Sequence, residues 1–271
     1  MSGKSGLGEA GAALLRGRLA RIVARHGGDL SELVHIALED GREAMVKNGP
    51  APDAEGEMLE AIAAAGAPAP KVIAMNGDVL VMEVLEEGGG AHSASASLGR
   101  ALKTLHAERG ERYGWHRDFA FGRVAIENGW ADDWPAFWGE RRLLTSVRHV
   151  DARLARRLES LAADLSNRLP ARPAASLLHG DMWAGNVVAA GGEVTGLVDP
   201  ASYYGHAEVD LAMLTLFGGP CEAFFEAYGP LEPGHEERRP IYQLWPALVH
   251  LRLFGSGYRS MVERFLSAAG V

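Results

Sequence analysis

The spacing of three polar side chains in the second half of this 271-residue chain constrains its fold more than any other feature. Asp181 and Asn186 lie five positions apart, and Asp199 follows thirteen positions after Asn186. The residues between Asn186 and Asp199 are strand-like on both sides of Gly191-Gly192, a pattern that predicts a β-hairpin. A hairpin of this length would bring the Asp199 carboxylate back beside the Asn186 amide. Because Mg²⁺ prefers hard oxygen ligands, we predict that Asn186 and Asp199 bind this metal.

An aspartate and an asparagine at this spacing also match the catalytic loop of kinases, in which the aspartate accepts the proton of the attacking hydroxyl. We therefore predict that Asp181 is the catalytic base of a phosphoryl transfer from ATP. His179 is expected to support this loop by hydrogen bonding. The alternative is a polar turn, in which Asp181 caps a helix and Asn186 takes a left-handed conformation. The ordered combination of all three side chains with a hairpin favours the chemical interpretation.

Upstream of these residues the chain alternates helical and strand-like segments. The apolar pattern predicts an amphipathic helix over residues 10–26, and good helix formers predict another over 54–65. A strand pair follows each helix, over 33–38 and 42–47 in the first case and over 71–75 and 79–85 in the second. Asp40-Gly41 between the first two strands predicts a type I′ turn, which needs positive φ at both central positions.

The glycines at 88–90 are expected to form a hinge, because glycine accepts almost any backbone geometry. Beyond them the pattern predicts helices over 93–108, 134–144, 151–169 and from 209 onward, interrupted by strand-like residues 177–180 and by the hairpin. This order predicts an α+β fold with two lobes. Residues 1–87 would form an ATP-binding lobe on a small antiparallel sheet, and residues 88–271 a larger, mainly helical lobe for catalysis and substrate binding.

The first lobe offers a cation for the phosphates of ATP. Lys47 ends a strand, Glu43–Lys47, that resembles the Val-Ala-Ile-Lys strand of kinases, so we predict that it contacts the α- and β-phosphates. A carboxylate must hold such a lysine. Glu55 shares a helix face with packing residues and is the first choice, with Glu57 as the second.

Other contacts to ATP are predicted from position along the chain. Gly28 and Ser31 belong to a short glycine-containing loop whose N–H groups would cover the phosphates. Glu83 and Leu85 lie in the expected hinge strand, where their backbone groups would approach the adenine.

These motifs together resemble the fructosamine kinase (ketosamine-3-kinase) family, a branch of the aminoglycoside-phosphotransferase-like kinases with a protein-kinase-like fold. The resemblance covers nearly the whole chain and is most specific between residues 178 and 219. It is carried by His179–Asn186, Val198–Met213, Leu216–Gly219 and Phe224–Tyr228, by the segment from Asn128 to Leu143 with its tryptophans, and by Gly27–Asp29 and Val46-Lys47.

The resemblance implies phosphorylation of a hydroxyl on a ketosamine, a sugar joined to an amine by glycation, with ATP and Mg²⁺. It gives Asp181, Asn186 and Asp199 the roles already predicted. Glu208 and Asp210 fit the acidic positions after the metal-binding aspartate, and Asp210 is expected to brace the catalytic loop. Trp183 and Trp130 could flank a sugar ring, and the alternative is that they belong to a core, which is the commoner place for an aromatic residue.

One segment departs from the family pattern and leaves the acceptor open. Members commonly carry asparagine and glutamine where this chain has Phe119 and Glu127, or a neighbour of Glu127, near the expected acceptor pocket. An aminoglycoside or amino-alcohol phosphotransferase is therefore an alternative. A catalytically silent nucleotide-binding module is disfavoured, because Lys47 and the polar residues of the catalytic loop are all present.

Composition limits the classes of partner that this chain is expected to bind. The formal net charge of −8 gives no basic surface for nucleic acid, and no apolar run reaches the roughly 18–20 residues that span a bilayer. Cys221 is the single cysteine and cannot form an internal disulfide, which suits a cytoplasmic protein. The expected partner is a small molecule or glycated amine, and the chain could be a monomer or a dimer.

Overall fold

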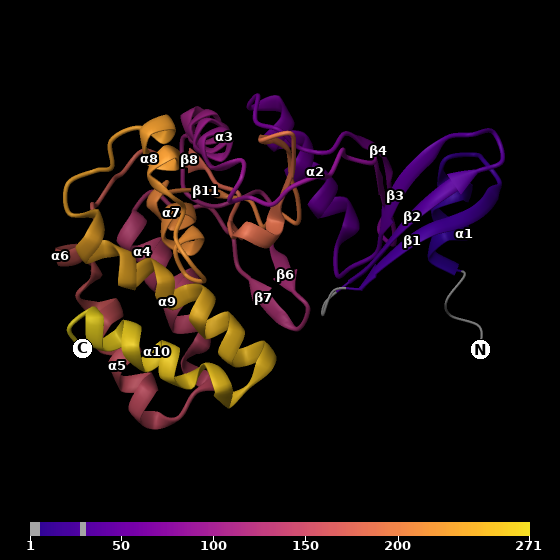
Figure 1. Cartoon of the computed structure of the whole chain (residues 1–271). Coiled ribbons are helices and arrows are strands. Elements are labelled where there is room, and N and C mark those ends of the chain that lie inside the picture. The colour runs from indigo at the N-terminus through magenta and orange to yellow at the C-terminus, as the bar shows by residue number, and fades with distance from the viewer. Residues whose placement is uncertain (1–5, 28–30) are drawn as a thin grey trace.

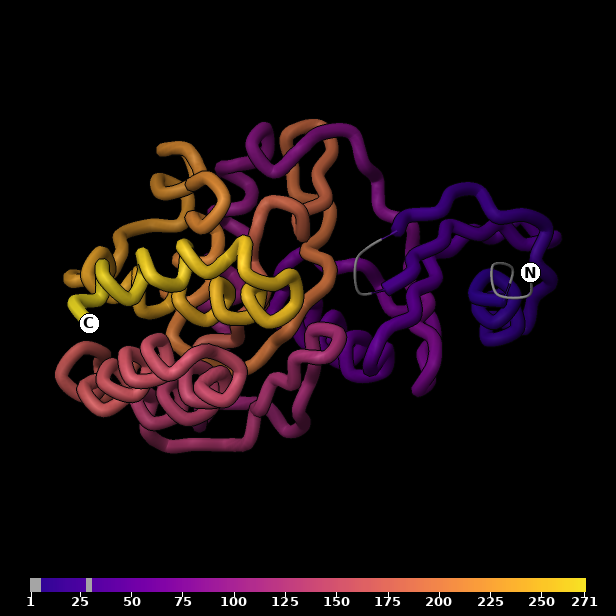
Figure 2. The backbone as a smooth tube through the Cα atoms, turned by 90° about the horizontal axis from the view of Figure 1, so that it is seen from below, coloured from indigo at the N-terminus to yellow at the C-terminus, as the bar shows by residue number. Residues whose placement is uncertain are grey.

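The computed structural model describes residues 6–27 and 31–271 of the chain. It has the predicted α+β class, with a sheet lobe at one end and a larger helical lobe at the other (Figure 1). The first described residues and the C-terminus lie at opposite ends of the molecule (Figure 2). No helix in the described residues is long and apolar enough to cross a membrane.

The sheet lobe contains a five-stranded antiparallel sheet in the order β1-β2-β3-β5-β4. Its elements are α1 (Gly6–Leu14), β1 (Leu19–Gly27), β2 (Glu32–Leu38), β3 (Glu43–Lys47), α2 (Pro52–Ala64), β4 (Val72–Met75) and β5 (Leu80–Met82). Both predicted strand pairs and the helix α2 are present. Val34, Ile36, Val46 and Val81 have no exposed surface and form the centre of the core of this lobe.

The predicted helix over residues 10–26 is wrong. The chain forms α1, turns at Arg16, whose φ is 53°, and then forms β1 along the edge of the sheet. β1 pairs with the whole length of β2, but its register shifts between Leu19 and Arg21 and again between Ile22 and Ala24. These bulges break the strict two-residue alternation, which explains why the sequence pattern did not indicate a strand.

The predicted type I′ turn between β2 and β3 is also wrong. Gly41 has a φ of 87°, but Asp40 is not in the left-handed region, and β2 and β3 are joined by residues 39–42. The Asp40 carboxylate accepts hydrogen bonds from the backbone N–H and the guanidinium of Arg42. These hydrogen bonds between Asp40 and Arg42 hold the four-residue connection, which is longer than the predicted two-residue turn.

Residues 83–94 lead to the helical lobe, which is built around a long α9 (His235–Phe254) that packs on α7 and α10. Its other helices are α3 (Ser95–Ala107), α4 (Trp134–Trp138), α5 (Ala152–Ala163), α6 (Leu165–Arg168), α7 (Glu208–Leu214), α8 (Glu222–Tyr228) and α10 (Arg259–Ala268). A π-helix (Gly139–Leu143) and a 3₁₀-helix (Leu144–His149) continue α4, and shorter 3₁₀ turns cover Ala184–Asn186 and Ser256–Tyr258. The predicted helix over 151–169 is divided at Asp164 into α5 and α6.

Three two-stranded sheets lie within the helical lobe: β6 (Phe119–Phe121) with β7 (Val124–Ile126), β8 (Ser176–Leu177) with β11 (Tyr204–Gly205), and β9 (Val187–Ala190) with β10 (Glu193–Leu197). The β9–β10 hairpin was predicted. The β6–β7 hairpin was not, and it forms where the sequence departs from the family pattern.

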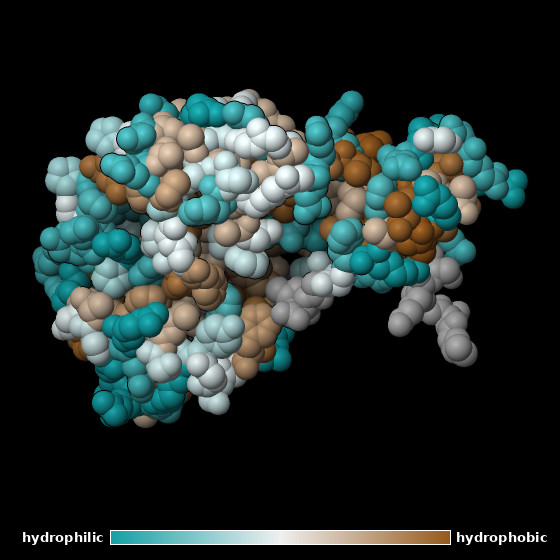
Figure 3. All heavy atoms as spheres, viewed as in Figure 1, coloured by the Kyte–Doolittle hydropathy of each residue, from teal (hydrophilic) through white to brown (hydrophobic). Residues whose placement is uncertain are grey.

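Helix α2 links the two lobes through its outer face. Glu57 pairs with His116 at 3.0 Å and with Arg117 at 3.1 Å, and Asp53 pairs with Arg117 at 3.2 Å. The surface is hollowed between the lobes (Figure 3).

Candidate active site

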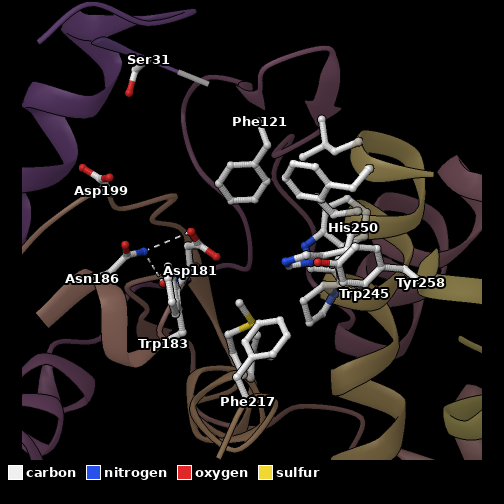
Figure 4. Close-up of a pocket in the computed structure, with 17 residues that line it drawn as sticks. Ser31, Phe121, Asp181, Trp183, Asn186, Asp199, Phe217, Trp245, His250 and Tyr258 are labelled. Carbon is white, nitrogen blue, oxygen red and sulfur yellow. Dashed lines mark hydrogen bonds between the residues drawn. The ribbon is translucent and has the colours of Figure 1, made fainter. Parts of the chain in front are cut away.

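The β9–β10 hairpin brings the metal-ligand candidates together. The N–H of Val198 donates to the Asn186 carbonyl at 3.0 Å, which places Asp199 next to Asn186. The Asn186 Nδ2 donates to the backbone carbonyl and to Oδ2 of Asp181, at 2.8 and 3.1 Å. The Asn186 oxygen is therefore turned away from Asp181, toward the side where Asp199 lies (Figure 4).

Asp199 itself has an unusual backbone. Its φ is 56°, and it is one of two non-glycine residues with positive φ in the described chain. Such a conformation costs energy for a residue with a side chain, although aspartate tolerates it better than most. The strained backbone directs the carboxylate of Asp199 toward Lys47.

Lys47 lies between two carboxylates. Its Nζ is 2.7 Å from Glu55 Oε1 and 2.8 Å from Asp199 Oδ1. Burial would lower the pKa of Lys47, but the negative charges of Glu55 and Asp199 outweigh this effect, and the pKa is raised. Lys47 is therefore charged. Glu55 rather than Glu57 is its partner, because Glu57 lies on the outer face of α2.

The Asp181 carboxylate points into the cavity (Figure 4). Burial raises its pKa to about 7; the hydrogen bond from Asn186 opposes this shift, and the negative charges of Asp199 and Asp210 add to it. A carboxylate whose pKa approaches the working pH is a better proton acceptor than an ordinary aspartate.

Asp210 braces the loop that carries Asp181. Its two oxygens accept the backbone N–H groups of His179 at 2.7 Å and Gly180 at 2.9 Å. Gly180 has a φ of 82°, and a Cβ there would lie 2.0 Å from the Ala201 carbonyl oxygen, so this position requires glycine. The carboxylate also contacts His106 Nε2 at 3.1 Å.

His106 in turn contacts the hydroxyl of Tyr228 through Nδ1, at 2.9 Å. Sequence reasoning did not find His106 or Tyr228 because they come from α3 and α8, far from the loop along the chain. Spacing along the chain relates neither of them to Asp210.

His179 is buried and connects the loop to the hairpin. Its Nδ1 accepts the N–H of Asp181 at 3.3 Å, so its Nε2 carries the proton and donates to the Val198 carbonyl at 2.9 Å. Burial lowers its pKa, against the charge of Asp210. These hydrogen bonds are compatible with the supporting role predicted for His179, which stays a prediction.

A cavity of about 640 Å³ extends from Ser31, Asp181 and Asp199 to the last helices of the chain. Phe121 and Trp183 line it near Asp181. Its far side, here called the aromatic wall, consists of Phe217, Trp245, His250, Phe254 and Tyr258 (Figure 4). Sequence reasoning missed this wall, because aromatic residues at helical spacing are more often part of a core.

Three rings of the aromatic wall, those of Phe217, Phe254 and Tyr258, lie around His250. Its ring centroid lies 5.4 Å from that of Phe217, 5.6 Å from that of Phe254 and 4.9 Å from that of Tyr258. The His250 Nδ1 is 2.7 Å from the Pro246 carbonyl and therefore carries a proton, so in the neutral imidazole Nε2 is a hydrogen-bond acceptor.

The remaining predicted site residues lie elsewhere. Trp130 does not line this cavity and stacks on Tyr204, with ring centroids 6.4 Å apart. Glu208 is buried in an ion pair with Arg238, at 2.8 Å from its Nε. Neither residue lines the cavity that contains Asp181.

The residues predicted to contact the adenine and the phosphates of ATP lie in different parts of the structure. Glu83 closes the end of the β4–β5 pair, where its N–H donates to the Lys71 carbonyl at 3.0 Å. Its carboxylate accepts the N–H of Lys71 at 2.7 Å. The side chain of Leu85 packs toward Gly196 on β10. Ser31 lines the cavity, whereas Gly28 lies outside the described residues.

The two-lobed fold, with a lysine–glutamate pair in the sheet lobe facing an aspartate and an asparagine in the helical lobe, is that of the aminoglycoside-phosphotransferase-like kinases. A macrolide 2′-phosphotransferase from Brachybacterium faecium has the same fold, with a TM-score of 0.63 at 18% identity over 98% of each chain. At this identity the likeness concerns the fold alone.

Within this class, the chain belongs to the fructosamine kinase family, whose model matches residues 23–269. A Synechocystis protein named as a ketoamine kinase is 38% identical over 200 residues, which cover 69% of this chain and 66% of that protein. The structure of a Thermobifida fusca protein described as a fructosamine-3-kinase is 31% identical, with a TM-score of 0.87 over 98% of this chain and 99% of that one.

Proposed function

We propose that this protein is a ketosamine kinase, which transfers the γ-phosphoryl group of ATP to a sugar hydroxyl of a fructosamine, a ribulosamine or another glycated amine. The observation that carries the proposal is the position of Asp181. Its carboxylate faces one cavity that has Asp199, the ion-pair partner of Lys47, at one end and the aromatic wall at the other.

The charged end suits the phosphates of ATP with a divalent cation. Lys47 is charged and held by Glu55, so it can contact the α- and β-phosphates. The Asn186 oxygen is turned away from Asp181, and the Asp199 side chain is half exposed, so both offer hard oxygen ligands that fit Mg²⁺. When bound, Mg²⁺ would neutralise charge on the transferred phosphoryl group.

At the reacting centre, Asp181 orients the acceptor hydroxyl and receives its proton as the oxygen attacks the γ-phosphorus and ADP leaves. The Asn186 amide holds one Asp181 oxygen in place, and Asp210 fixes the backbone of the loop. Phosphoryl transfer leaves little covalent chemistry for the protein, so these contacts act by positioning.

The aromatic wall supports a ketosamine better than an aminoglycoside. Aminoglycosides carry several ammonium groups and need several carboxylates, whereas the carboxylates lining the described cavity are Asp181 and Asp199. A ketosamine has one amine cation, which aromatic faces attract, and hydroxyls that can donate to His250 Nε2. This chemistry favours an acceptor with one positive charge.

The test is ADP release from MgATP with purified protein and a panel of ketosamines, aminoglycosides and amino alcohols. We expect turnover of a fructosamine or ribulosamine, and the variant Asp181→Ala should abolish it while still binding MgATP. Turnover limited to another acceptor class would discard the ketosamine. Full activity of Asp181→Ala would discard the proposed base.

A further inference from the structure

A group of basic side chains lies beside the acceptor end of the cavity. This group, here called the arginine cluster, consists of Arg123 from the β6–β7 turn, Arg148 and His149 at the end of the 3₁₀-helix, and Arg252 in the last turn of α9. The Arg123 Nη2 donates to the backbone carbonyls of Arg252 and of Leu253, the latter at 3.0 Å. Arg148 Nε contacts His149 Nε2 at 3.1 Å. The charges of Arg123 and Arg148 both act on Arg252, so the three segments lie close together.

The arginine cluster has no negative partner in the part of the chain that the structure describes. Burial lowers the pKa of Arg252, and the positive charges of Arg148 and Arg123 lower it further, with no carboxylate acting on it. Burial also lowers the pKa of His149, together with the charges of Arg252 and Arg148. Several basic side chains thus lie together in a chain whose formal net charge is −8.

Arg252 carries the clearest sign of a missing ligand. Its Nη1 is buried and has no hydrogen-bond partner among the described residues. A buried donor without an acceptor is destabilising, the more so when it is charged. The nearby Arg259 shows the ordinary arrangement, because it pairs with the carboxylates of Asp151 and of Glu263, the latter at 3.0 Å.

The position of the arginine cluster relates it to the acceptor. Phe121 and Gly122, directly before Arg123, and Leu253 and Phe254, directly after Arg252, line the described cavities. The arginines themselves lie beside the cavity rather than in its lining. A group that reaches them must therefore extend beyond the sugar that occupies the cavity.

We propose that the arginine cluster is a binding site for a carboxylate or phosphate group. Guanidinium groups match the oxygens of both anions, and a charge-assisted hydrogen bond would satisfy the buried Arg252 Nη1. As a statement about the acceptor, which rests on the proposed function, the site selects ketosamines whose amine portion carries an anionic group at a distance from the sugar.

The first arm of the test needs no activity. The thermal unfolding midpoint of the full chain is measured in inorganic phosphate and in chloride at equal ionic strength, for the wild type and for Arg148→Gln/Arg252→Gln. We expect phosphate to stabilise the wild type more than this variant, with an affinity difference of about tenfold or more. In chloride the variant should be at least as stable as the wild type, because like-charge repulsion is removed. The control Arg153→Gln/Arg156→Gln removes two exposed arginines from α5 and should respond to phosphate as the wild type does.

The second arm compares two ketosamines made from the side-chain amine of Nα-acetyl-lysine, one with a free carboxylate and one with a carboxamide. In Arg148→Gln/Arg252→Gln the KM for the carboxylate should rise about tenfold, and the KM for the carboxamide should not change. A phosphate effect without this kinetic effect would assign the site to a free anion. Wild-type behaviour of the variant in both arms would overturn the site. If no ketosamine is turned over, the proposed function fails, and the phosphate arm still decides on the arginine cluster.

Discussion

The two ends of the cavity are built on different principles. At the end where we propose that the phosphates of ATP bind, here called the phosphate end, Asp199 lines the cavity and is joined to Lys47 and, through it, to Glu55 by ion pairs of 2.8 and 2.7 Å. At the acceptor end, the rings of the aromatic wall that lie around His250 leave much surface free, with Phe217 51% and Phe254 46% exposed. The first arrangement fixes charges for one reaction, while the second offers a surface that selects by shape. Substitutions in the wall can therefore change the acceptor without changing the chemistry.

The largest effect should come from breaking the phosphate end. Lys47→Met leaves the buried Glu55 carboxylate without its cation, which should lower the free energy of unfolding by about 3 kcal/mol. It should also lower kcat on every acceptor by about 10²-fold or more, because a charge that stabilises the phosphates is lost. Urea unfolding and ADP release measure the two effects.

A double variant separates stability from catalysis. Lys47→Met/Glu55→Gln removes the unpaired charge and should regain much of the lost stability, but it should remain inactive. Wild-type stability of Lys47→Met alone would contradict the buried ion pair. Activity of the double variant would show that the phosphates are held by other groups.

The residues around Lys47 and Asp181 could be predicted from the sequence. Lys47 at a strand end, and Asp181, Asn186 and Asp199 around one hairpin, are local patterns, so their convergence could be predicted from spacing. The β2, β3 and α2 elements were predicted for the same reason, because their apolar periods are regular. The choice of Glu55 over Glu57 followed from the helix face.

Long-range packing set the features that could not be predicted. β1 is an edge strand with two register shifts, and its apolar residues mimic a helical period. The aromatic wall lies on helices, where spacing alone does not distinguish a cavity lining from a core. Trp183 and Trp130 illustrate this limit, because both were candidates to flank a sugar and the cavity includes one of them.

These two tryptophans provide a matched test of the acceptor end. Trp183 is 39% exposed and lines the cavity, whereas Trp130 is 41% exposed and stacks on Tyr204. Trp183→Ala should lower kcat/KM for the acceptor about tenfold, the effect of losing one aromatic contact, with the KM for ATP unchanged. Trp130→Ala should leave both constants near the wild-type values.

Equal losses in the two tryptophan variants would mean that the cavity does not define the acceptor site. A raised KM for ATP in Trp183→Ala would instead place this ring at the phosphate end and remove the distinction between the two ends.

The smallest effect concerns the loop that joins the two ends. The pKa of buried His179 is lowered in the folded state, so the unfolded chain binds the additional proton as the pH falls below about 6.5. The stability that the neutral imidazole contributes is full above that pH and is lost as the pH falls toward the folded pKa. The wild type should therefore lose up to about 1.4 kcal/mol per pH unit more than His179→Gln.

Urea unfolding of both proteins at pH 8, 6.5 and 5.5 isolates this effect. At pH 8, the difference in the free energy of unfolding between the wild type and His179→Gln measures the lost hydrogen bonds to Asp181 and Val198. The decrease of this difference toward pH 5.5 measures the titration of His179. A difference that stays constant would mean that His179 accepts a proton in the folded protein. The Asp181 N–H, which now donates to Nδ1, would then face a second N–H, and the loop that positions the proposed catalytic base would have to rearrange.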